Sequence, residues 1–125
     1  TESMLGIVPD PPAMGFRLAE EAYRNGESWR EKLIAYLREN RDCAITQIHD
    51  MNGLIPFSPQ ATYLLWIDAR NLNVKNSHSF FEKAGVGLSD GRDFGAPGFL
   101  RLNLGCTREL LKKALGRMGQ AVLSL

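Results

Sequence analysis

The residue best suited to chemistry is Arg101, which lies in the run GFLRLNLGC at positions 98–106. The side chains there should alternate with the period of two that is typical of a strand. Leu100, Leu102, Leu104 and Cys106 fall on one face, and Phe99, Arg101 and Asn103 on the other. A planar guanidinium can hold a carboxylate through two parallel hydrogen bonds, worth about 1.5–3 kcal/mol where water is excluded. The alternative is a solvated strand arginine without a ligand, and the residues alone leave both interpretations open.

A glycine-rich loop precedes this strand, with glycines at 85, 87, 91, 95 and 98 and an aromatic residue, Phe94, among them. The run lacks the G-x-G-x-x-G spacing between a strand and a long helix that pyrophosphate binding requires. Its Asp-Gly-Arg-Asp segment at 90–93 lacks the alternating ligands of a calcium loop. We expect the loop to exclude water from Arg101 only if another domain closes over the same face.

Other reactive side chains do not form a recognisable site. His49 and His78 have no spacing that suggests metal ligation or a base for a nucleophile, so no metal site is predicted. The five lysines fall on polar helix faces or turns, where nothing would desolvate an amine. No catalytic residue is therefore predicted within this chain.

Composition limits the possible partners. The 125 residues suit one domain with its own core, and a net charge of +1 gives no electrostatic case for nucleic acid or an anionic membrane. Two cysteines and the lack of a long apolar run or a visible signal peptide favour a reducing, cytoplasmic location.

The elements that must position Arg101 follow from periodicity and punctuation. Residues 1–12 look like a linker, and the start at Thr1 looks like a cut in a longer chain. A short amphipathic helix is expected over 13–25, and a capping box from Ser28 to Glu31 predicts a long helix over 29–51. Further predictions are an edge segment at 54–59, a strand at 61–70, a helix at 77–84, a short strand at 86–88 and a last helix capped by Thr107. This order predicts an α+β fold, a two-layer sandwich of a small, mostly antiparallel sheet with helices on one face, preceded by a long helix.

Three segments together resemble a known family. They are ATYLLWID at 61–68, VGL at 86–88 with its glycine-rich loop, and GFLRLNLGC at 98–106. In this order they resemble the C-terminal part of pyridoxal-phosphate-dependent enzymes of aminotransferase class I and II. Within that family they are most similar to the carbon–sulfur β-lyase branch, the cystathionine β-lyases of the MalY/PatB type. The resemblance covers residues 13–125.

The resemblance implies a role for three residues. Arg101 would bind the α-carboxylate of an amino-acid substrate, and Phe94 and Gly95 would lie near the cleft between two domains. The Schiff-base lysine, the aspartate that pairs with the cofactor and the phosphate-binding residues would belong to a large domain that this chain lacks. The resemblance thus implies that residues 13–125 are a small domain, inactive alone, of a homodimeric enzyme that cleaves a thioether amino acid such as cystathionine to a thiol, pyruvate and ammonia.

Two other functions remain open. The parent enzyme could instead be a plain aminotransferase of the same family. Alternatively, the chain could be a freestanding α+β module in which Arg101 binds a small carboxylate. RNA binding on the open sheet face is disfavoured, because Phe99 is the only aromatic residue expected there and no basic stripe accompanies it.

Overall fold

The computed structural model describes residues 12–125, so the predicted linker lies almost wholly outside the described residues. The chain divides into two compact units, one up to Ala35 and the other from Tyr36 to Leu125. The first unit contains α1 (Ala13–Asn25) and the beginning of α2 (Glu27–His49). None of the residues of α1 is buried.

The junction between α1 and α2 corrects one prediction. Helix α2 begins at Glu27, so Ser28 lies inside its first turn and does not cap it. The backbone amide of Arg30 donates to the carbonyl of Gly26 (2.9 Å), and the Glu27 carboxylate accepts from the Arg30 side chain. Gly26 is required because a Cβ there would lie 2.3 Å from the carbonyl oxygen of Ala22. The bounds predicted for α1 are confirmed.

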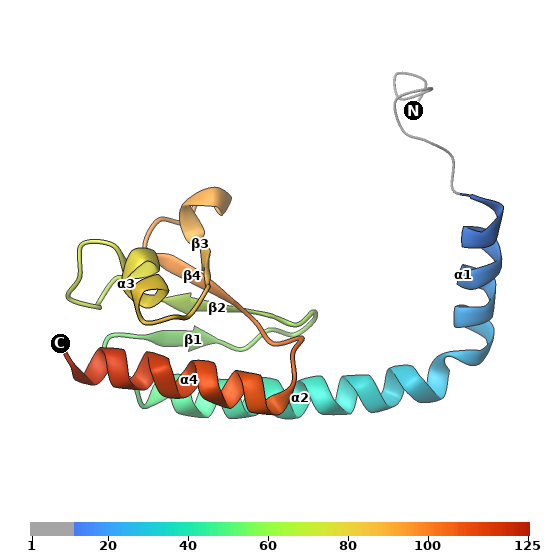
Figure 1. The fold of residues 1–125 in the computed structure, drawn as a ribbon, viewed down its shortest axis with the longest axis horizontal. Coiled ribbons are helices and arrows are strands. Elements are labelled where there is room, and N and C mark those ends of the chain that lie inside the picture. The colour runs from blue at the N-terminus through green and yellow to red at the C-terminus, as the bar shows by residue number, and fades with distance from the viewer. Residues whose placement is uncertain (1–11) are drawn as a thin grey trace, which may run out of the picture. The chain divides into compact units, whose positions relative to one another are not determined.

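The second unit is built on a four-stranded antiparallel sheet (Figure 1). Its strands are β1 (Ile55–Phe57), β2 (Leu64–Asp68), β3 (Ser89–Asp90) and β4 (Phe99–Asn103), in the order β1-β2-β4-β3. Its helices are the C-terminal part of α2, α3 (Ser77–Lys83), the 3₁₀ turn η2 (Gly91–Phe94) and α4 (Arg108–Leu123). The predicted α+β fold with an antiparallel sheet is confirmed. The strand expected at 61–70 is shorter, since it starts only after Thr62, whose φ is +66°. The short strand expected at 86–88 instead forms at Ser89–Asp90.

One face of the sheet carries the hydrophobic core. Its strand residues pack with side chains from α2, α3 and α4: Leu65, Ile67, Leu100 and Leu102 with Ala44, Ile48, Phe81, Leu111, Leu115 and Met118. The predicted alternation in β4 is confirmed, because Leu100 and Leu102 are buried while Phe99 and Arg101 are half-buried. Helix α4 runs beside the C-terminal part of α2 (Figure 1) and is capped by Thr107, whose hydroxyl accepts from the Leu110 amide.

A buried polar residue joins these helices to the sheet. Asn40 of α2 is fully buried, and its amide donates to the carbonyls of Leu104 (2.9 Å) and Cys106 (3.0 Å). Its carbonyl oxygen accepts from Arg108 at the start of α4. These bonds satisfy backbone groups where β4 ends, which would be costly to bury unpaired.

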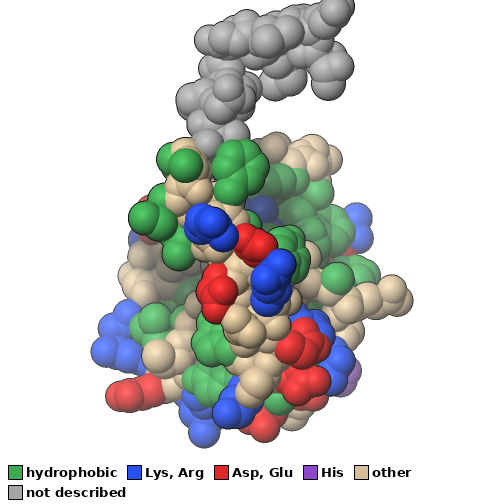
Figure 2. Space-filling model, turned by 90° about the vertical axis from the view of Figure 1, so that its right-hand side faces the viewer, with side chains coloured by type: hydrophobic (Ala, Val, Ile, Leu, Met, Phe, Trp, Pro, Cys, Tyr) green, Lys and Arg blue, Asp and Glu red, His purple; other side chains and the backbone are tan. Residues whose placement is uncertain are grey.

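Surface charge follows the near-neutral composition. On the face that Figure 2 shows, Lys and Arg side chains are interspersed with Asp and Glu and do not form a single patch.

Within residues 12–125, no helix combines the length and apolar character needed to cross a bilayer. The same part of the chain contains no cluster of three or more His, Cys, Asp and Glu side chains suited to a metal ion.

Candidate functional site

The side of the sheet away from the core, called here the open face, has Arg101 near its centre. The strand register places four residues in one row across the sheet: Phe57 on β1 opposite Trp66 on β2, Trp66 opposite Arg101 on β4, and Arg101 opposite Ser89 on β3. Because directly opposed residues in an antiparallel sheet point to the same face, these side chains can contact one another.

The guanidinium of Arg101 has few protein partners. One of its terminal nitrogens, Nη2, donates to the hydroxyl of Ser89 at 3.2 Å. Its central carbon lies 4.3 Å from the centre of the Phe94 ring, a cation–π contact. Within residues 12–125 no carboxylate lies within 4.0 Å of its nitrogens. The open face therefore presents a positive charge that the described residues do not neutralise.

A cluster of aromatic rings adjoins this charge through Phe94. Trp66 meets Phe94 edge to face, with centroids 5.6 Å apart, and lies 6.3 Å from Phe99. Phe99 in turn lies 6.2 Å from Phe57. Phe57 and Phe94 remain about half exposed, at 51% and 48%. Such a cluster is apolar surface without cover, which marks binding sites and interfaces more often than ordinary surface.

A structured turn delivers Phe94 to this cluster. The Asp90 carboxylate accepts from the backbone amide of Arg92 (2.9 Å) and from its guanidinium, which starts the η2 turn. Gly91 is buried so tightly that a Cβ would lie 2.2 Å from the carbonyl oxygen of Ala96. Gly95 ends the turn at φ +73°, a conformation that favours glycine. The side-chain hydrogen bond from Arg92 lowers the pKa of Asp90, so Asp90 stays charged at neutral pH. This Asp90–Arg92 ion pair is called here the brace.

A second arginine on the open face differs from Arg101. Arg70 lies over the ring of Phe99, 4.9 Å from its centre, but pairs with Asp68 through two hydrogen bonds of 3.0 and 2.8 Å. The hydrogen bond from Arg70 lowers the pKa of Asp68 and keeps it ionised. Since Arg70 is already neutralised by a local acid, Arg101 is the better candidate for a carboxylate ligand.

The structure brings two of the three predicted site residues together. Phe94 contacts Arg101, whereas Gly95, at the end of the turn, contributes a backbone conformation and no side chain. The sequence pattern did not identify Ser89 as a partner of Arg101, nor Trp66 as the residue opposite it on β2. The strand register carries this information: Trp66 is placed by the pairing of β2 with β4, and Ser89 by the pairing of β3 with β4. The strand β3 was expected three residues earlier, at 86–88.

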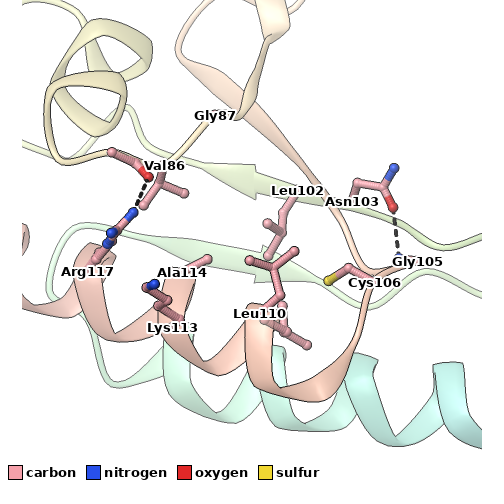
Figure 3. Close-up of a pocket in the computed structure, with 12 residues that line it drawn as sticks. Val86, Gly87, Leu102, Asn103, Gly105, Cys106, Leu110, Lys113, Ala114 and Arg117 are labelled. Carbon is pink, nitrogen blue, oxygen red and sulfur yellow. Dashed lines mark hydrogen bonds between the residues drawn. The ribbon is translucent and has the colours of Figure 1, made fainter.

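A separate pocket of about 390 Å³ lies between the end of β4, the 85–87 loop and α4 (Figure 3). Leu102, Cys106, Leu110 and Lys113 are among its lining residues, and Arg117 closes one end by donating to the carbonyl of Gly85 at 2.9 Å. None of the predicted site residues lines this pocket. Leu102 of the core face and Asn103 of the open face both line it, so the pocket lies at the end of β4 and away from Arg101, which is not among its lining residues.

Comparison with known proteins confirms the resemblance seen in the sequence. Residues 4–118 match the family described as aminotransferase class I and II. The cystathionine β-lyase of Corynebacterium glutamicum is 33% identical over 114 residues, covering 87% of this chain and 30% of that protein. Protein MalY of Escherichia coli (strain K12) is 35% identical over 111 residues, covering 81% of this chain and 27% of its own length.

Solved structures agree with these matches. A crystal structure of OvoB superposes with a TM-score of 0.94 and 42% identity, over 99% of this chain and 33% of that one. The structure of a putative PLP-dependent β-cystathionase from Corynebacterium diphtheriae gives a TM-score of 0.86 and 38% identity, over 94% and 32% of the two chains. The chain thus spans about a third of the length of these relatives, and it belongs to the aminotransferase class I and II family.

Proposed function

We propose that residues 13–125 are the C-terminal, substrate-carboxylate-binding domain of a pyridoxal-phosphate-dependent carbon–sulfur β-lyase. The relatives named cystathionine β-lyase support the lyase assignment, and their greater length supports a further, larger domain in the complete protein. The reaction would be β-elimination from a thioether amino acid, giving a thiol, pyruvate and ammonia. By the same resemblance, we expect a homodimer in the cytoplasm.

The observation that carries this proposal is the unneutralised guanidinium of Arg101 in the middle of the aromatic open face. A guanidinium has five N–H donors, and one of them is used by Ser89. Two parallel donors therefore remain for the α-carboxylate of the substrate, which would orient the neighbouring Cα–H bond toward the reacting groups. Phe94, with Gly95 permitting its turn, would cover one side of this pair and exclude water from it.

The residues of this chain do not fit a pyridoxal-phosphate site. All five lysines, at positions 32, 75, 83, 112 and 113, are exposed, so no amine is enclosed beside Arg101. The pocket that contains Lys113 has no carboxylate in its lining that could pair with a pyridine nitrogen. This supports a division of labour in which the larger domain holds the cofactor and the present chain binds the substrate. It also supports the expectation that the present chain alone is inactive.

The location of the cofactor can be tested by borohydride reduction of the complete protein, which fixes pyridoxal phosphate to its lysine. Peptide mapping should then find the label outside the present 125 residues. A label on any of the five lysines of this chain would contradict the proposed division.

The reaction type can be tested by product analysis. A lyase should release pyruvate and a thiol from cystathionine without a keto-acid acceptor. Aminotransferase activity is the second candidate, favoured by 30% identity over 112 residues to a protein of Aquifex aeolicus (strain VF5) named probable aspartate/prephenate aminotransferase. Product formation that requires a keto acid would select this second function.

A further inference from the structure

Two side chains, those of Ser89 and Phe94, contact the guanidinium of Arg101 directly. The hydroxyl of Ser89 accepts from Nη2, and the central carbon of the guanidinium lies over the ring of Phe94. We propose that Ser89 and Phe94 are positioning residues that fix the plane of the Arg101 guanidinium before a carboxylate arrives. This inference rests on the proposed function, because it names the residues through which the carboxylate site is set.

The strand pairing explains the contribution of Ser89. Ser89 lies directly opposite Arg101 across the β3–β4 pair, so its short side chain projects from the same face. The contact anchors the far end of a long side chain that otherwise samples many rotamers. A hydroxyl oxygen is neutral, so it can orient a guanidinium without neutralising it, whereas a carboxylate at this position would compete with the substrate.

Phe94 restrains the guanidinium of Arg101 through the contact with its ring. The centre of its ring lies 4.3 Å from the central carbon of the guanidinium, and the ring itself meets Trp66 of β2 edge to face. The Asp90–Arg92 brace and the left-handed Gly95 fix the turn from which Phe94 projects. The hydrogen bond to Ser89 and the cation–π contact with Phe94 thus act on different parts of one guanidinium, and its remaining donors stay free for a bidentate contact with a carboxylate.

If Ser89 and Phe94 lower the conformational entropy of the Arg101 side chain before a ligand binds, their loss should have a specific effect on the kinetics. Binding of a carboxylate no longer has to freeze the arginine side chain, so loss of either restraint should weaken carboxylate binding and leave the chemical step unchanged. A merely structural role for these residues would affect all ligands alike.

The test uses the complete, cofactor-loaded protein with S-ethyl-L-cysteine as substrate and its α-carboxamide as a competitor that lacks the carboxylate. Ser89→Ala should raise KM about 3- to 10-fold, and Phe94→Leu about 2- to 5-fold, with kcat changed less than about twofold. Ser89→Thr, which keeps the hydroxyl, should have the KM of the unmodified protein. Ser124→Ala, which replaces a serine at the end of α4, is the control and should have no effect on KM. The inhibition constant of the carboxamide should be the same in every variant.

The reference variant is Arg101→Ala, which separates the two proposals. An increased KM in Arg101→Ala with unchanged KM in Ser89→Ala and Phe94→Leu would overturn the positioning role alone. Equal weakening of carboxylate and carboxamide in Ser89→Ala and Phe94→Leu would also overturn it. Unchanged KM in Arg101→Ala would overturn the proposed function itself, and the positioning role with it.

Discussion

The two faces of the sheet are built from alternate residues of the same strands, yet they differ in how far the chain satisfies them. On the core face, Leu100 and Leu102 pack against three helices, and the buried Asn40 has partners for both its donors and its acceptor. On the open face, Arg101 has no acid partner among the described residues, and the rings of Phe57 and Phe94 are about half exposed. Stability is therefore provided by one face, and the other is available for binding.

This difference explains why an arginine can occupy the centre of a strand. A cation on the core face would have to be desolvated and paired, at a cost of several kcal/mol. On the open face Arg101 keeps part of its contact with water and gains only weak contacts from Ser89 and Phe94. Such a residue contributes little to folding, and a ligand that brings a negative charge can use it.

The largest expected effects come from substituting Leu100 and Arg101, which are adjacent in β4 but lie on opposite faces of the sheet. In the complete protein, Leu100→Ala removes a fully buried side chain and should lower the unfolding free energy by about 2–5 kcal/mol. Arg101→Ala should lower it by less than about 1 kcal/mol but raise KM about 10- to 150-fold, the loss of 1.5–3 kcal/mol of carboxylate binding. Urea unfolding together with steady-state kinetics would separate the two. A large stability loss in Arg101→Ala would show that the two faces do not divide in this way.

The next effect concerns the polar part of the core face. Asn40→Ala leaves the carbonyls of Leu104 and Cys106 without their side-chain donors and should lower the unfolding free energy by about 2–4 kcal/mol. Asn103→Ala is the matched control, because Asn103 is exposed and accepts one bond from the Gly105 amide. Its loss should be below about 1 kcal/mol, as measured by thermal unfolding. Equal losses in the two variants would contradict the assignment of Asn40 to the core.

The smallest effect should depend on pH. Because Arg92 lowers the pKa of Asp90 in the folded protein, this pair stabilises the folded state fully above the ordinary aspartate value of 3.8. The contribution is lost as the pH falls through the lower, folded pKa. Asp90→Asn should therefore be slightly less stable than the unmodified protein at neutral pH, and the difference should shrink as the pH falls below 3.8. Asp93→Asn serves as the control, and a difference that grows on acidification would contradict the brace.

Local patterns predicted most of the elements and the position of Arg101 on its strand, but not its partner Ser89. The bounds of α1, the cap at Thr107 and the alternation in β4 depend on neighbours in sequence, and the structure confirms them. The partners of Arg101 depend on which residue of a loop pairs with β4. With the short strand expected at 86–88, Ser89 had no predicted partner, although the pairing of β3 places it opposite Arg101.

The prediction of a capping box at Ser28 was wrong for a related reason. The pattern from Ser28 to Glu31 satisfies the local rule, yet Gly26 lets the chain pass from α1 into α2 with only one residue between the helices. The amide of Arg30 makes the first backbone bond of α2, to the carbonyl of Gly26. Ser28 lies inside the first turn and not at the N-cap position, so the pattern does not act as a capping box.

The most direct test of the account is a crystal structure of the complete protein with an unreactive amino-acid substrate analogue. We predict that both oxygens of its α-carboxylate lie about 2.7–2.9 Å from two nitrogens of Arg101, beside the Phe94 ring. An Arg101 guanidinium paired instead with an aspartate or glutamate from the rest of the protein, with the ligand carboxylate held elsewhere, would contradict the assignment.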